Sequence, residues 1–142
     1  MLIPLSRDVK LLTEYLKVTI SDSKKTLEHN PSNKHAYSTL QQSLLSLIVL
    51  FNRRRCGEVS KMALADFYGL HSSYNLAEEL QMSKLEKELC RCFTGLEVVG
   101  RRGWLVPILL TAVMKDAVSL LVKCRDSVEV NPANEYVFAC MN

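Results

Sequence analysis

The stretch "LIVLFNRRRCGEVSKM", residues 47–62, decides the expected fold of the chain around it. Its apolar first part ends abruptly at three consecutive arginines, Arg53, Arg54 and Arg55. A helix that is apolar around most of its circumference is normally buried in the middle of a domain. A new amphipathic segment begins at Gly57, directly after the arginines. The stretch therefore predicts a buried helix and a short second helix, with a cluster of cations at their junction.

Hydrophobic periodicity on both sides of this stretch predicts a mainly α domain with one small β-hairpin. The expected elements are a helix opening at Ser6, a helix over 34–52, a short helix near Gly57, a helix capped at Ser83, a hairpin over 96–109 with its turn at 101–103, a helix capped by Thr111, and an extended piece at "EYVFA", 135–139. Residues 63–75 are expected to be irregular. We expect two parts, an N-terminal helix with its linker over 1–33 and the main domain over 34–142.

Composition narrows the class of protein. The chain has 142 residues, of which 48% are hydrophobic, and a net charge of +3. These values favour one packed domain and permit a nucleic-acid partner without demanding one. No signal peptide or membrane span is expected, so the chain is interpreted as intracellular and not bound to a membrane. The five cysteines have no metal-ligand spacing, so neither a metal nor a cofactor is predicted.

The arginines form two clusters, and each falls at the end of an expected element. Arg53, Arg54 and Arg55 precede the short third helix, and Arg101 and Arg102 occupy the hairpin turn. Unpaired backbone N–H groups at a helix start favour an anion, and a guanidinium matches two phosphate oxygens. Together the clusters could hold a phosphate from two sides. The competing interpretation is that the first cluster caps a helix and the second is a solvated turn.

The segment around the first cluster resembles the first catalytic-arginine segment of tyrosine recombinases. Arg55 and Glu58 have that family's Arg-x-x-Glu spacing, and "LEVVGRRGWLVPILLT", 96–111, resembles the hairpin that follows in the family. Domesticated, Crypton-derived recombinase-like proteins of vertebrates resemble the chain most, over about Pro4 to Ala139. The resemblance implies a truncated tyrosine-recombinase catalytic-domain-like fold. It also implies remnant catalytic roles for Arg55 and Arg101, with Glu58 orienting Arg55.

Two departures from the family bear on activity. Arg101 stands at the family's hairpin lysine, which acts there as a proton donor, and arginine is a poor acid because its pKa exceeds about 12. The family's His-x-x-Arg pair and tyrosine nucleophile are expected beyond the "YxFA" strand, whereas this chain ends three residues after Ala139. We therefore interpret the chain as catalytically incomplete and not an enzyme, with Tyr136 as a strand residue.

Three functions are compatible with these features. The first is a DNA-binding or DNA-associated remnant of recombination and integration machinery, nuclear, in which Arg53, Arg54, Arg55, Arg101 and Arg102 contact DNA weakly and with little sequence preference. The second is a protein-interaction module without a DNA role. The third is part of an active recombinase completed by a longer isoform. Because an incomplete domain exposes core surface, we also expect a homodimer or a protein partner to cover an apolar face at "LLSLIVLF", 44–51.

Overall fold

The computed structural model describes residues 6–53, 56–68, 93–100 and 103–139. Within these residues it contains five helices and a two-stranded antiparallel sheet. The elements are α1 (Ser6–His29), α2 (Lys34–Asn52), α3 (Cys56–Ser60), α4 (Leu64–Tyr68), β1 (Phe93–Val99), β2 (Leu105–Thr111) and α7 (Ala112–Lys123). The expected mainly α architecture with one hairpin is confirmed. The expected helix at Ser83 lies outside the described residues.

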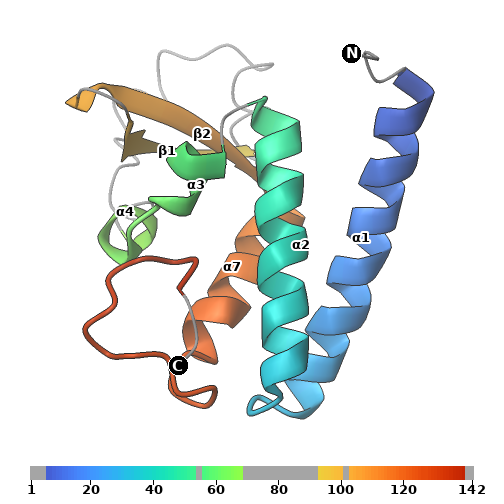
Figure 1. Cartoon of the computed structure of the whole chain (residues 1–142), viewed down its shortest axis with the longest axis vertical. Helices are drawn as coiled ribbons and strands as arrows, with labels where there is room; N and C mark the ends of the chain where they lie inside the picture. The colour runs from blue at the N-terminus through green and yellow to red at the C-terminus, as the bar shows by residue number, and fades with distance from the viewer. Residues whose placement is uncertain (1–5, 54–55, 69–92, 101–102, 140–142) are drawn as a thin grey trace, which may run out of the picture.

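The chain reverses direction between the two long helices. The side-chain oxygen of Asn33 accepts a hydrogen bond of 3.0 Å from the Ala36 backbone N–H and so caps the start of α2. The N–H of Asn30 returns to the carbonyl of Thr26, which closes the last turn of α1. The two helices are therefore antiparallel neighbours that lie close together at this turn and diverge toward the opposite end (Figure 1).

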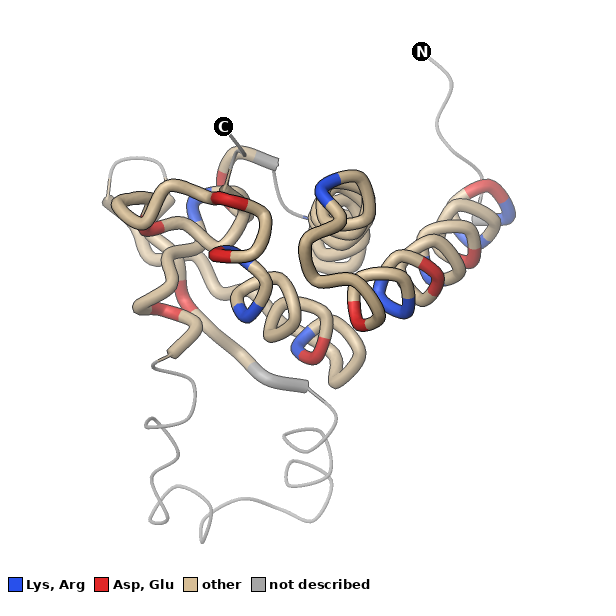
Figure 2. Tube along the Cα trace, turned by 90° about the horizontal axis from the view of Figure 1, so that it is seen from below, with Lys and Arg blue, Asp and Glu red and all other residues tan. Residues whose placement is uncertain are grey.

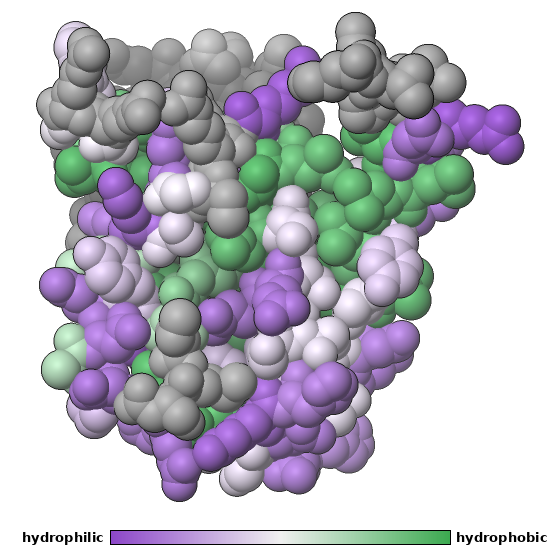
Figure 3. All heavy atoms as spheres, viewed as in Figure 1, coloured by the Kyte–Doolittle hydropathy of each residue, from purple (hydrophilic) through white to green (hydrophobic). Residues whose placement is uncertain are grey.

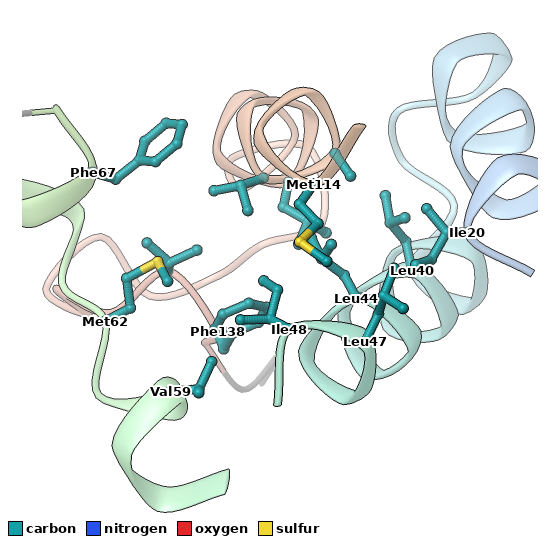
Figure 4. Close-up of a cluster of buried hydrophobic side chains, with 14 of the residues drawn as sticks. Ile20, Leu40, Leu44, Leu47, Ile48, Val59, Met62, Phe67, Met114 and Phe138 are labelled. Carbon is teal, nitrogen blue, oxygen red and sulfur yellow. The ribbon is translucent and has the colours of Figure 1, made fainter. Parts of the chain in front are cut away.

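Helix α2 lies at the centre of the molecule, between α1 and α7 (Figure 1). Its residues Leu40, Leu44 and Ile48 are fully buried, because side chains of the surrounding elements pack against them in one core cluster. Figure 4 shows these side chains converging with others from α1, the α3–α4 segment, α7 and the C-terminal segment. The exposed apolar face expected at 44–51 is present only in part: Leu44, Leu47 and Ile48 are buried, Leu45, Val49 and Leu50 are partly buried, and Phe51 is 44% exposed.

The hairpin forms at the expected place, although its strands extend beyond 96–109, to Phe93 and Thr111. Val99 pairs with Leu105, so the connection is centred on the expected turn, and Gly103 has a φ of 75° that suits glycine. The N–H of Gly100 donates to the carbonyl of Trp104 over 2.7 Å. Because hydrogen-bonded and non-bonded pairs alternate in an antiparallel ladder, Pro107 falls in a non-bonded pair, where its missing N–H costs nothing.

The C-terminal segment packs back over α2 and α7. Arg125 is 8% exposed, and its guanidinium donates to the backbone carbonyls of Tyr136 and Asn134. The side-chain amide of Gln41 on α2 donates to the carbonyl of Ala139 over 2.9 Å. The expected extended piece is present as a short antiparallel bridge between Tyr136 and Ala63. These contacts tie the end of the described chain to the core.

Residues 63–75 were expected to be irregular, and within the described part of this range the expectation is wrong. Helix α4 forms there because the carboxylate of Asp66 accepts a hydrogen bond of 3.3 Å from the N–H of Ala63, which caps its start. The N–H of Leu64 also donates to the carbonyl of Glu135 over 2.8 Å. Phe67 then turns into the core (Figure 4).

Candidate functional site

The structure describes only part of the predicted site. Arg53 and Glu58 lie within the described residues. The other predicted site residues, Arg54, Arg55, Arg101 and Arg102, lie outside them. The described residues nearest to the clusters are the end of α2 and the two sides of the hairpin turn. The positions of these elements limit where the clusters can lie.

Arg53 has an unusual backbone conformation at the end of α2. Its φ of 52° and ψ of 41° are left-handed, and its N–H donates to the carbonyl of Val49. Glycine normally occupies this capping position, because a Cβ costs about 1–2 kcal/mol in the left-handed region. The side chain of Arg53 is exposed. The chain thus keeps an exposed cation at a position where glycine would be more stable.

Asn52 connects the end of α2 to the hairpin, and the sequence analysis missed it. Its side-chain Oδ1 accepts from the N–H of Leu109 over 2.7 Å, and its Nδ2 donates to the Leu109 carbonyl over 2.9 Å. The same Nδ2 lies 2.9 Å from the carbonyl of Ile48. Leu109 is in a non-bonded pair of the hairpin, so both of its backbone groups point away from β1. The side-chain amide therefore bonds both backbone groups of Leu109, as a neighbouring strand would, and connects β2 to α2.

This bridge relates the two arginine segments. Arg53 follows Asn52 directly, and Leu109 lies six residues after Gly103, which closes the turn of the second cluster. The turn end of β2 is Leu105, four residues before Leu109, so at about 3.3 Å per residue it lies about 13 Å from the bridge. Figure 1 shows the turn end of the hairpin extending away from α2 and the other end of β2 passing close to it. The Asn52 bridge thus connects the helix that leads into the first cluster to the strand that follows the second.

The acidic residues near the first cluster have different surroundings. Glu58 lies in α3 and is partly exposed, and no hydrogen bond or ion pair joins it to another described residue. Its expected partner, Arg55, lies outside the described residues, so the orienting role stays a prediction. Asp66 caps α4 through its hydrogen bond from the N–H of Ala63.

Two described tyrosines, Tyr37 and Tyr136, have different surroundings. Tyr37 is fully buried, its hydroxyl has no hydrogen-bond partner among the described residues, and burial raises the pKa of its hydroxyl. A raised pKa disfavours the phenolate that would attack a phosphate. Tyr136 lies in the short bridge to Ala63, as expected for a strand residue, and is 44% exposed.

The remaining charged groups of the described residues include those of the long helix α1. Along α1, basic and acidic residues alternate (Figure 2). No group of three or more His, Cys, Asp or Glu side chains in the described part of the chain could hold a metal ion. None of the helices described here is long and apolar enough to cross a membrane.

Comparisons with known proteins identified no relative of this chain. No protein-family model, no curated protein and no solved structure matches the chain.

Proposed function

We propose that this chain is a tyrosine-recombinase-like protein that associates with DNA through its two arginine clusters and does not cut it. The observation that carries the proposal is the Asn52 bridge, which holds the segments before and after the two clusters on one frame. Cations fixed relative to one another lose less entropy on binding than cations on independent loops. The resemblance of 47–62 and 96–111 to segments of tyrosine recombinases, which act on DNA, is the reason for proposing DNA as the partner.

The conformation of Arg53 supports a role beyond stability. A left-handed backbone at a residue other than glycine costs free energy, and such strain gathers at functional positions. If this position served only to end α2, glycine would serve it better. A cation here begins the run of three arginines, and it projects from a rigid helix end.

The spacing of the segments indicates how DNA would be contacted. The turn end of β2 lies about 13 Å from the bridge at the end of α2, close to the major-groove width of about 12 Å, so the clusters would reach phosphates on either side of a groove. Contacts of this kind position a protein on the duplex and carry no sequence information. A low sequence preference and a nuclear location follow from the proposal.

The expected affinity is weak. Five arginines in two clusters would neutralise about three to five phosphates. Glu97 is exposed on β1 within the same hairpin and would repel phosphates near it. Helix α3 has five residues, so its dipole adds little to the cations that precede it.

Cleavage is not expected from this chain alone. None of its three histidines, His29, His35 and His71, is followed by arginine at the third position, and arginine at 101 is a poor proton donor. Phosphoryl transfer needs a nucleophile and an acid besides the cations. A nicked suicide duplex tests this directly. A covalent protein–DNA band that survives boiling in detergent, and that is lost on Tyr136→Phe, would contradict the proposal.

Fluorescence anisotropy with a labelled duplex tests the binding site. Replacing Arg55 and Arg101 together by alanine should abolish measurable binding at low salt. The matched control replaces two exposed cations of α1, Arg7 and Lys10, by alanine, which lowers the net charge by the same amount. The control should bind nearly as well as the wild type. Equal losses in both variants would show that net charge alone, and not the clusters, attracts the DNA.

A protein-interaction module is the second candidate function, and specific surfaces favour it. Leu11, Tyr15 and Val18 of α1 are 56%, 66% and 61% exposed. The outward face of the hairpin adds Val99 and Leu105, also exposed. Contiguous apolar surface of this kind often marks a partner site.

A further inference from the structure

An apolar groove runs between the diverging ends of α1 and α2. Its volume is about 710 Å³. Its lining comes from α1, the end of α2, Arg53, and the junction of β2 with α7. Figure 3 shows apolar surface over the end of α2 and the neighbouring part of α1, where these two helices separate. The groove is distinct from the hairpin turn.

The α1 wall of the groove has helical regularity. Val9, Thr13, Lys17 and Ser21 line it at intervals of four residues. At 1.5 Å per residue, the twelve steps from Val9 to Ser21 span about 18 Å, the length of a helix of about 12 residues. The opposite wall includes Leu47 and other apolar residues of α2. The groove therefore has the length and the apolar floor that a short helix needs.

The charged residues that line the groove have one sign. Lys17 and Arg53 are the charged residues of its lining, and no acidic residue lines it. Both side chains are exposed, and neither forms an ion pair with another residue in the described ranges. An occupant with carboxylates at its edges would meet two available cations, whereas a basic occupant would be repelled.

The solvent exposure of the groove's walls indicates whether a small molecule or a helix would bind there. Val9 and Val113 line it, yet they are 36% and 59% exposed. A small-molecule site normally encloses most of its ligand's surface, which walls as exposed as these cannot do. A helix leaves one face in solvent and matches an open groove.

We propose that this groove docks an amphipathic helix of a protein partner, with an apolar stripe facing the floor and carboxylates at the edge facing Lys17 and Arg53. The apolar stripe covers the floor, and the carboxylates fix the register and the choice of partner. The inference goes beyond DNA association. Lys17 belongs to neither arginine cluster, so its substitution tests the groove and leaves the proposed DNA contacts in place.

Two synthetic peptides of about 12 residues test the groove. Both carry leucines at i, i+3, i+4 and i+7; one has glutamates beside the leucines, and its twin has lysines there. By isothermal titration calorimetry the glutamate peptide should bind at least about tenfold more tightly than its twin. Lys17→Glu should remove most of this preference, whereas Lys10→Glu, an exposed change on α1 outside the groove, should retain it. Val113→Ser should weaken the glutamate peptide without altering net charge.

Three results would overturn the inference. One is that neither peptide binds to a wild-type chain whose circular dichroism shows it to be folded. Another is that both peptides bind equally, which would make the groove a non-selective apolar surface. The third is a concentration-dependent dimer that Lys17→Glu disrupts, because the occupant would then be a second copy of the chain. Urea unfolding of Lys17→Glu should match the wild type, since the side chain is exposed.

Discussion

Replacing Asn52 by alanine tests whether DNA affinity depends on the relative position of the two arginine clusters or only on their charge. The substitution removes the side-chain amide that bridges the end of α2 to Leu109, and it leaves every arginine in the chain. The N–H and carbonyl of Leu109 would then turn to water, and β2 would lose its connection to α2. If the clusters act as a positioned pair, DNA affinity should fall although the net charge is unchanged.

The effect on stability can be estimated from the two hydrogen bonds to Leu109, since the third, to the Ile48 carbonyl, shares its donor Nδ2 with one of them. Each bond contributes about 0.5–1.5 kcal/mol net, which gives about 1–3 kcal/mol for the pair. Because this position is partly exposed, water can replace some of the lost bonding, so we expect the lower part of that range, about 1–2 kcal/mol. For a chain of this size, such a loss lowers the melting temperature by about 2–8 °C.

Urea unfolding followed by circular dichroism measures this loss, and duplex anisotropy measures the affinity. The control is Gln42→Ala on the same helix, which removes an exposed amide whose bond is to Ser38 at 3.4 Å. Gln42→Ala should leave both quantities near the wild type. If Asn52→Ala changes the free energy of unfolding by less than about 0.3 kcal/mol, the bridge does not hold the hairpin. An unchanged DNA affinity would show that the clusters act independently.

Three further predictions test other features of the structure. Arg53→Gly should raise the free energy of unfolding by about 0.5–1 kcal/mol, because it relieves the left-handed backbone, while lowering DNA affinity in the anisotropy assay. Gly100→Ala should cost about 1–3 kcal/mol in a urea titration, since its Cβ would lie 2.6 Å from Val106 Cγ2, and Val106→Ala added to it should recover part of the loss. The hydrogen bond from Lys34 lowers the pKa of the Glu129 carboxyl, so this pair contributes stability above the ordinary glutamate range and loses it as the pH falls through the lowered pKa. The loss should be small because both groups are exposed, and it should vanish from the pH dependence of the melting temperature in Glu129→Gln.

Local signals in the sequence were enough to predict the long elements. The polar break around Pro31 gave the bounds of α2, and the alternation around Gly103 gave the hairpin and its turn. Thr111 caps α7 as expected, since its hydroxyl accepts from the N–H of Met114 over 3.3 Å. These features depend on residues within a few positions of one another, which periodicity and capping rules can identify.

Contacts between distant segments could not be predicted in this way. The bridge from Asn52 to Leu109 spans 57 residues, and an asparagine that ends an apolar helix has no pattern naming its partner. Helix α4 is short and depends on its pairing with Glu135, so its own sequence did not reveal it. Leu44, Leu47 and Ile48 in the apolar stretch of α2 are buried because α1 and α7 flank this helix, and that arrangement is set by tertiary packing.

The salt dependence of duplex binding tests the central claim most directly. The logarithm of the association constant, plotted against the logarithm of the salt concentration, should fall with a slope of about −3 to −4.5 if three to five phosphates are neutralised. The Arg55 and Arg101 double alanine variant should show no measurable binding under the same conditions. A folded wild-type chain that shows no duplex binding at the lowest salt, or a slope near zero, would contradict association with DNA through the arginine clusters.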